Sequence, residues 1–263
     1  MDARKYAGKP GIEGLMECNN LQFVTDLQEW GLELSELQTT QLEQYYEMLV
    51  EKNKVMNLTA ITEYDDVLKK HFLDSLALNQ LVKLQGKKYR VLDMGTGAGF
   101  PGLPLKIMFP ELEVTLMDSL NKRIVFLQDV IEKLGLTGIK AVHGRAEEAA
   151  LKPEYREKFD FCVSRAVARL VSLSEFCIPF VKQGGFFIPY KSGEVEEEVN
   201  EAKHAVRELG AEYRKTYFYT LPNSDIERTL IYIEKVKTTP KKYPRAGGKP
   251  LKQPLLVNTF HKQ

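Results

Sequence analysis

Glycines alternate with other residues in one short stretch of this chain, VLDMGTGAGFPG at 91–102. Asp93 precedes Gly95, Gly97 and Gly99, and a strand-like segment leads into them. Glycine permits a sharp turn and lets the backbone approach a ligand without a β-carbon in the way. The first N–H groups of a following helix are unpaired and attract a carboxylate or phosphate. The stretch therefore predicts a cofactor-binding turn.

Two cofactors fit this turn. The residues from Gly97 to Gly102 match GxGxxG, the dinucleotide fingerprint. The larger frame, which begins at Asp93, resembles motif I of class I methyltransferases that use S-adenosylmethionine. Asp118 ends the next strand-like segment, about 20 residues after Gly97, and its carboxylate can accept both hydroxyls of a ribose. That spacing suits both cofactors, so an oxidoreductase using a nicotinamide cofactor and a methyltransferase both remain open on these residues alone.

The ends of two later strand-like segments carry further polar residues. GRAE at 144–147 stands where similar methyltransferases place a small and a polar residue at the adenine edge. The stretch 160–166, DFCVSRA, has no Asn/Asp-Pro-Pro-aromatic motif for methylating exocyclic amines. It also has no Pro-Cys nucleophile for carbon-5 pyrimidine methylation. Arg165 can hold a phosphate, a base edge or a cofactor carboxylate, and the alternative is a surface ion pair with Glu147 or Glu148.

Alternating strands and helices must position these residues. The strand-like segments are 89–93, 114–118, 139–143, 159–164 and 185–190, with a final pair at 213–220 and 227–234. This alternation predicts parallel βαβ units that bind ligands beyond the carboxyl ends of the strands. Two helical segments come earlier; a Ser35–Gln38 capping box begins the first, and Thr62 with Asp65 begins the second. The predicted fold is α/β, a Rossmann-like class I methyltransferase sheet with a helical N-terminal extension.

Composition divides the 263 residues into four parts. We expect a disordered leader at 1–20, a helical N-terminal cap at 21–85, a methyltransferase domain at 86–236 and a basic tail at 237–263. Apolar runs fall short of the roughly 18 residues of a membrane span, and the N-terminus lacks a secretory signal. The three cysteines show no CxxC spacing. The sequence thus predicts a cytoplasmic protein without a metal site and without membrane attachment.

Charge is distributed unevenly along the chain. The segment from Lys235 onward holds eight of the 37 Lys/Arg and no acid, so the other 234 residues carry 29 basic and 36 acidic side chains. A polyanionic partner contacted through this end is indicated, although such runs are also typical of solvated, disordered termini. We expect RNA phosphates to bind Lys241, Lys242, Arg245 and Lys249, with an affinity that falls as salt rises. Removing the residues after Glu234 should then weaken RNA binding and spare the cofactor.

Several segments together resemble one family, the bacterial small-subunit rRNA guanine-N7 methyltransferase G, also called glucose-inhibited division protein B. They are NLTAI at 57–61, HFLDSL at 71–76, LDMGTGAGFPGLPL at 92–105, VTLMDSLNKRIVFL at 114–127, GRAE at 144–147, SRAVARL at 164–170 and KYPRAGGKPLKQPL at 242–255. The resemblance implies S-adenosylmethionine as cofactor, bound by Gly95, Gly97, Gly99, Phe100, Asp118, Ser119, Leu120, Ala146, Glu147 and Arg165.

The resemblance also implies the acceptor: N7 of a guanine in the 530 loop, in the decoding region of 16S rRNA. Guanine N7 carries a free lone pair, so we expect direct in-line transfer and no catalytic general base. His71, Asp74 and Arg165 are the acceptor-pocket candidates; His71 and Asp74 share a helix face, and the alternative for them is an interdomain hydrogen-bond network. Phe100 and Arg165 can line the space of an unstacked base.

The expected partner is 16S rRNA, free or within the small ribosomal subunit or an assembly intermediate. The sequence predicts a monomer with no stable protein partner. A small-molecule methyltransferase would share the glycine turn but would need no basic tail. A non-enzymatic RNA-binding protein would leave the cofactor turn without a use.

Overall fold

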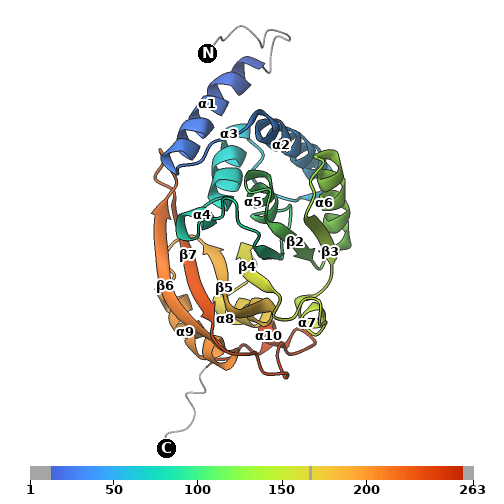
Figure 1. The fold of residues 1–263 in the computed structure, drawn as a ribbon, viewed down its shortest axis with the longest axis vertical. Helices are drawn as coiled ribbons and strands as arrows, with labels where there is room; N and C mark the ends of the chain where they lie inside the picture. The colour runs from blue at the N-terminus through green and yellow to red at the C-terminus, as the bar shows by residue number, and fades with distance from the viewer. Residues whose placement is uncertain (1–12, 166–167, 257–263) are drawn as a thin grey trace, which may run out of the picture.

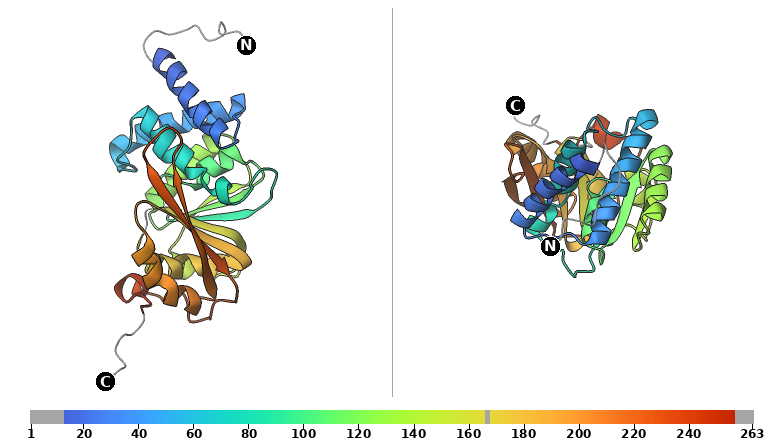
Figure 2. Two further views of the ribbon diagram at one scale, coloured as in Figure 1. Left: turned by 90° about the vertical axis from the view of Figure 1, so that its left-hand side faces the viewer. Right: turned by 90° about the horizontal axis from the view of Figure 1, so that it is seen from above.

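A seven-stranded β-sheet forms the centre of the chain in the computed structural model, which describes residues 13–165 and 168–256 (Figure 1). The strands are β1 (Arg90–Met94), β2 (Glu113–Asp118), β3 (Ile139–His143), β4 (Phe159–Arg165), β5 (Val181–Lys191), β6 (Ala211–Thr220) and β7 (Glu227–Lys235). Their order is β3-β2-β1-β4-β5-β7-β6. The first five run parallel, whereas β7 is antiparallel to β5 and β6. Figure 2 shows the long β6–β7 pair at one side of the molecule.

Helices cover both faces of this sheet (Figure 1). They are α1 (Glu13–Glu29), α2 (Glu36–Met56), α3 (Tyr64–Val67), the π-helical turn η1 (Leu68–Leu73), α4 (Leu78–Leu81), α5 (Gly102–Met108), α6 (Asn121–Lys133), α7 (Ala146–Ala149), α8 (Leu170–Cys177), the 3-10 turn η2 (Ile178–Phe180), α9 (Glu196–Glu208) and α10 (Lys249–Lys252). Strand order reverses between β1 and β4, and ligands of open α/β sheets bind at such a reversal, beyond the carboxyl ends of the strands.

Two apolar cores form because successive side chains of a strand point to opposite faces. In β1, Val91 packs with α2, α5 and α6, whereas the next residue, Leu92, packs with α8 and α9. Tyr45 of α2 and Phe72 of η1 are fully buried in the same core as Val91. The helices between residues 21 and 85 are therefore bound to the sheet by a shared core rather than by a surface contact.

The sheet and the first helix agree with the prediction. Each predicted strand has a counterpart, and the largest difference is β5, which begins at Val181 rather than at 185. The sequence VKQGG hides that start because it lacks apolar alternation, and Gly184 has a positive φ of 78°. The predicted capping box at α2 is confirmed, since the Ser35 and Gln38 side chains each accept the other residue's backbone N–H.

The second predicted helix differs. Glu63, not Thr62, precedes α3, and it caps the helix with its backbone alone. The Thr62 carbonyl instead accepts the Tyr46 hydroxyl at 3.1 Å. The helical path then widens into η1, so apolar spacing alone did not distinguish an α-helix from this mixed segment.

The two ends of the described chain can be compared with the predicted leader and the predicted basic tail. Helix α1 begins at Glu13, within the segment predicted as a leader, while residues 1–12 lie outside the described residues. Of the predicted basic tail, residues 237–256 are described, and they fold back onto the body. Within 13–165 and 168–256, no helix has the length and apolar character needed to cross a membrane.

Candidate functional site

The glycine turn joins β1 to α5 at the carboxyl end of β1. Gly95 and Gly97 have φ values of 68° and 61°, a conformation that glycine adopts without strain. The N–H groups of Gly95 and Thr96 donate to the Met117 carbonyl at 2.8 and 3.1 Å. These bonds tie the turn to the end of β2, where Asp118 follows.

The glycines of this turn serve different purposes. A β-carbon on Gly97 would meet only the Gly95 carbonyl oxygen, at 4.0 Å, so this part of the turn is open to a ligand. A β-carbon on Gly99 would lie 2.4 Å from a Leu103 methyl carbon, and one on Gly102 would lie 2.3 Å from a methyl carbon of Leu116. Gly99 lets the turn pack closely against α2, α5 and α6, and Gly102 lets α5 pack closely on the sheet.

Asp118 is buried at the end of β2 and fixed by three donors. Its Oδ2 accepts the Gly97 N–H at 3.0 Å and Arg123 Nη1 at 3.1 Å, and its Oδ1 accepts the Leu120 N–H at 2.9 Å. A carboxylate has about four lone-pair positions, so one remains for a ligand hydroxyl. The acid predicted to bind ribose thus also shapes the glycine turn.

A cavity of about 350 Å³ adjoins the turn. Five residues predicted for the cofactor line it: Gly95, Asp118, Ser119, Ala146 and Glu147. The other lining residues are Met94, Met117, Arg123, Gly144, Arg145, Phe176, Gly248 and Leu251. Thioether and aromatic groups beside polar ones suit an adenosine, which has an apolar ring face and a polar edge.

The remaining cofactor candidates are not lining residues of this cavity. Gly97 and Leu120 contact Asp118 only through their N–H groups, and Gly99 packs against α5. Phe100 is buried beneath a second hollow, to which Arg165 also belongs. Sequence reasoning missed Gly248 and Leu251, because their distance along the chain from the turn leaves no local signal.

Asp93 supplies the feature that best tests the fit of a cofactor. Its Oδ2 accepts the Thr96 hydroxyl at 2.7 Å and the Gly102 N–H at 2.8 Å. Its Oδ1 is buried and has no hydrogen-bond partner among the described residues. A buried acceptor without a donor is costly, so a donor such as an amino group is expected beside it. Together with the open glycine and the Asp118 carboxylate, this acceptor fits the amino acid and ribose parts of S-adenosylmethionine.

Burial raises the pKa of Asp93 to about 6, against the hydrogen bonds from Thr96 and Gly102, which lower it. The folded state therefore binds more protons than the unfolded state between pH 3.8 and 6, and stability falls as pH rises through this window. We expect wild type to lose about 2 kcal/mol of unfolding free energy relative to Asp93→Asn between pH 4 and 7. Urea titrations of both proteins at pH 4 and pH 7 measure this change. If the difference in unfolding free energy between wild type and Asp93→Asn is the same at both pH values, the pKa of Asp93 is not raised.

A second hollow, of about 450 Å³, lies beside β4, β5 and η1 and contains all three acceptor candidates. Arg165 Nη1 donates to Asp74 Oδ2 at 3.1 Å, whereas the predicted alternative was a pair with Glu147 or Glu148. Two residues of the β6–β7 pair join this network: the Tyr219 hydroxyl donates to Asp74 Oδ1 at 2.8 Å, and Arg228 Nε lies 3.6 Å from Oδ2. The network links the helical segment to the sheet and also borders the hollow.

His71 is held in one tautomer within this network. Arg165 Nη2 lies 3.3 Å from His71 Nδ1, and a guanidinium can only donate, so Nδ1 accepts. Its Nε2 therefore carries the proton and lies 2.8 Å from the Thr59 hydroxyl oxygen. Burial, followed by the charge of Arg165, lowers the pKa of His71 to about 3. The imidazole is neutral at physiological pH, and both nitrogens are engaged.

Phe100 forms the base of this region. Its ring stacks on His71 with 4.5 Å between centroids, and the Arg165 guanidinium carbon lies 5.0 Å from its centroid. The ring is 6% exposed, so Phe100 supports the His71 and Arg165 planes rather than presenting its own face.

The four predicted RNA-binding residues of the tail differ in their surroundings. Lys241, Lys242 and Lys249 are exposed. Arg245 instead forms a two-pronged ion pair with the buried Glu175, with Nε to Oε1 at 3.0 Å and Nη2 to Oε2 at 2.7 Å. Its guanidinium is engaged in holding the tail against α8.

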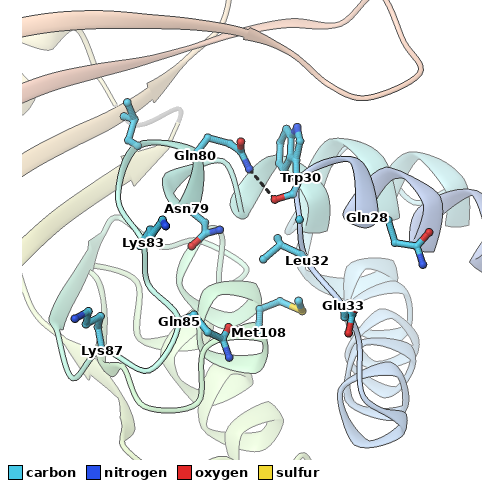
Figure 3. A pocket seen from close by; sticks show the side chains of 12 residues that line it. Gln28, Trp30, Leu32, Glu33, Asn79, Gln80, Lys83, Gln85, Lys87 and Met108 are labelled. Atoms are coloured by element: carbon cyan, nitrogen blue, oxygen red, sulfur yellow. Dashed lines mark hydrogen bonds between the residues drawn. The ribbon is translucent and has the colours of Figure 1, made fainter.

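A larger hollow, of about 920 Å³, lies away from all these residues (Figure 3). It is bordered by the end of α1, α4 and the segment before β1, with Trp30, Gln80, Lys83 and Lys87 among its lining residues. Gln80 Nε2 donates to the Trp30 carbonyl at 3.4 Å. It contains no residue of the glycine turn or the Asp74 network, so its size does not make it the reaction site.

The sheet order, the glycine turn at β1, the acid at the end of β2 and the cavity between them define a class I methyltransferase that uses S-adenosylmethionine. A solved structure of MtNAS in complex with MTA and tNA has a TM-score of 0.50 and 13% identity, covering 76% of this chain and 75% of that one. That likeness concerns the fold alone.

Comparison with known sequences gives the particular family. The family model for rRNA small subunit methyltransferase G matches residues 38–226. A protein of that name from Lachnoclostridium phytofermentans is 58% identical over 238 residues, which cover 90% of this chain and 98% of that protein. Another from Lactococcus lactis subsp. lactis is 50% identical over 234 residues, covering 89% and 98%. The chain belongs to the rRNA small subunit methyltransferase G family.

Proposed function

We propose that this enzyme methylates N7 of a guanine in the 530 loop of 16S rRNA. Membership of the family supports an rRNA substrate. One observation carries the choice of atom: among the described residues, the His, Asp and Glu side chains that line the acceptor hollow are all engaged by other groups. His71 has both nitrogens engaged, Asp74 is paired with Arg165, and Glu198 accepts from Lys191. An acceptor that must lose a proton before attack would need an available general base, whereas guanine N7 attacks through a free lone pair.

When bound, S-adenosylmethionine supplies an electrophilic sulfonium methyl group. The chain's own contribution is orientation, which can be worth about 7–11 kcal/mol at best. The rigid planes of His71 and Arg165, supported by Phe100, can hold an unstacked purine. The methylated base gains a positive charge, which the Asp74 and Glu198 carboxylates bordering the hollow can offset.

Cationic side chains around the hollow suit a polyanionic substrate. Lys70, Lys191 and Arg228 border it together with Arg165. The exposed Lys241, Lys242 and Lys249 of the tail extend the positive charge, and RNA affinity should fall as salt rises. Arg245 is excluded from this set because Glu175 engages it.

Labelled methyl transfer to small ribosomal subunits that lack the modification tests this proposal. We expect a single methyl group, mapped to N7 of a guanine in the 530 loop. Parallel assays with free 16S rRNA show whether the assembled subunit is required. Transfer to a metabolite, with none to RNA, would support a small-molecule methyltransferase instead. Transfer to another atom of the guanine would contradict the argument that the acceptor needs no general base.

Asp74→Asn tests the acceptor hollow itself. The substitution weakens the ion pair that holds Arg165, and breaking a buried pair costs about 3–5 kcal/mol when one charge is left alone. We expect methyl transfer at saturating cofactor to fall at least tenfold, with cofactor affinity changed less than twofold because Asp74 lies outside the cofactor cavity. Asp65→Asn, on the exposed surface of α3, is the matched control. If Asp74→Asn changes neither methyl transfer nor RNA affinity, Asp74 has no role in the acceptor site.

A further inference from the structure

The C-terminal segment is anchored to the body well before α10. Arg156 Nη1 donates to the Tyr243 carbonyl at 3.0 Å, and its Nη2 donates to the Thr239 carbonyl at 2.9 Å. Tyr243 is buried in the core that α8 and α9 form with the sheet. The Arg156 side chain thus fixes the backbone of the segment that leads to α10.

Arg245 then fixes the segment against α8. Its N–H donates to Glu175 Oε1 at 2.7 Å, in addition to the two guanidinium contacts with the same carboxylate. Glu175 is 1% exposed and the Arg245 side chain 23%, so the carboxylate end of this pair is shielded from solvent. Arg245 Nη2 also donates to the Gln253 carbonyl at 2.8 Å, closing a loop around α10. Within that loop the Ser172 hydroxyl donates to the Pro250 carbonyl at 2.7 Å.

The loop closed in this way borders the cofactor cavity. Gly248 and Leu251 line the same cavity as Gly95 and Asp118. Phe176, the neighbour of Glu175 on α8, lines it too. Leu251 is 59% exposed, an unusual state for a leucine placed beside a cavity of mixed polarity. An apolar ligand surface that enters the cavity would cover this side chain.

We propose that residues 245–253 form a wall of the S-adenosylmethionine cavity and that Arg245 and Glu175 are its positioning pair. Leu251 supplies apolar contact to the adenosine part of the cofactor. The pair acts through Leu251 and Gly248 by holding the loop in place. Deletion of the tail should then weaken cofactor binding, which replaces the expectation from sequence that only RNA binding would suffer.

Isothermal titration of the full chain with S-adenosylhomocysteine tests the wall, and no RNA is needed. We expect Leu251→Ser to weaken binding five- to tenfold. Leu256→Ser is the matched control, because Leu256 is 44% exposed in the same segment and does not line the cavity; its effect should stay below twofold. Both residues lie on the surface, so both variants should fold. An unchanged affinity in folded Leu251→Ser would overturn the proposal.

The role of the Arg245–Glu175 pair is tested by combining substitutions at Arg245 and Leu251. Arg245→Lys retains a charge but lacks the planar fork, so we expect it to weaken binding less than Arg245→Ala does. If the pair acts through Leu251, the effect of Arg245→Ala should shrink in a Leu251→Ser background. In turnover assays the KM for S-adenosylmethionine should rise while kcat at saturation is retained. Fully additive effects, or a loss of RNA affinity with unchanged S-adenosylhomocysteine affinity, would refute the role. Because the titration contains no RNA, its outcome is independent of the proposed methylation target.

Discussion

Replacing Asp118 with asparagine is expected to weaken S-adenosylhomocysteine binding about 100-fold, as measured by isothermal titration. The Asp118 carboxylate accepts from Gly97, Leu120 and Arg123, and an asparagine amide presents a donor where one of its acceptor oxygens stood. A hydrogen bond to a charged group contributes about 1.5–3 kcal/mol, and a buried donor left without a partner costs a similar amount. The substitution should therefore disturb the predicted ribose contact and the glycine turn together.

Asp129→Asn is the control for this substitution, because Asp129 is an exposed acid on α6, the helix that follows Asp118. It should bind S-adenosylhomocysteine like wild type. Thermal unfolding without ligand separates a binding defect from a folding defect. An Asp118→Asn chain that unfolds normally and binds within threefold of wild type would show that the cofactor does not depend on this carboxylate.

The features that sequence analysis predicted well are local ones. Short apolar runs predicted the central strands, because parallel strands that helices cover on both faces are buried almost throughout. The link between Gly97 and Asp118 was also accessible, since consecutive parallel strands place their carboxyl ends together. In the same way Ala146 and Glu147, which follow the third strand, reach the cofactor cavity. Each inference needed only a strand and the residues immediately after it.

The missed features depend on contacts between distant segments. Tyr219 and Arg228 reach Asp74 only because β7 turns antiparallel against β5 and β6 pairs with it. Leu251 reaches the cavity in a segment that Arg156, Ser172 and the Arg245–Glu175 pair hold against the body. In each case the sequence shows the residue types but not which distant partner they meet. The basic composition of the tail led to the prediction that Arg245 binds phosphate. Composition could not show that Arg245 instead pairs with a buried acid, Glu175.

Gly99→Ala is expected to destabilise the chain by about 3 kcal/mol, as measured by urea unfolding. Gly99 has a φ of 110°, and its β-carbon would lie 2.4 Å from a Leu103 methyl carbon and 2.8 Å from the Tyr45 hydroxyl oxygen. Overpacking of a tight core costs about 1–3 kcal/mol, and the strained backbone adds about 1–2. The Tyr45 hydroxyl also donates to the Ala98 carbonyl at 2.6 Å, so the substitution strains the contact that holds α2 against the turn.

Gly135→Ala separates the two causes, because Gly135 has a φ of 61° and a β-carbon there would meet nothing within 4 Å. Backbone strain alone should cost this control about 1 kcal/mol. Below its unfolding temperature, Gly99→Ala should keep S-adenosylhomocysteine affinity within a few fold, because the crowded side of Gly99 faces α2 and α5 rather than the cavity. If the two alanine variants are equally stable, close packing of α2 on the turn is not what requires glycine. If affinity falls sharply while stability is kept, Gly99 serves the cofactor directly, as its place in the motif first indicated.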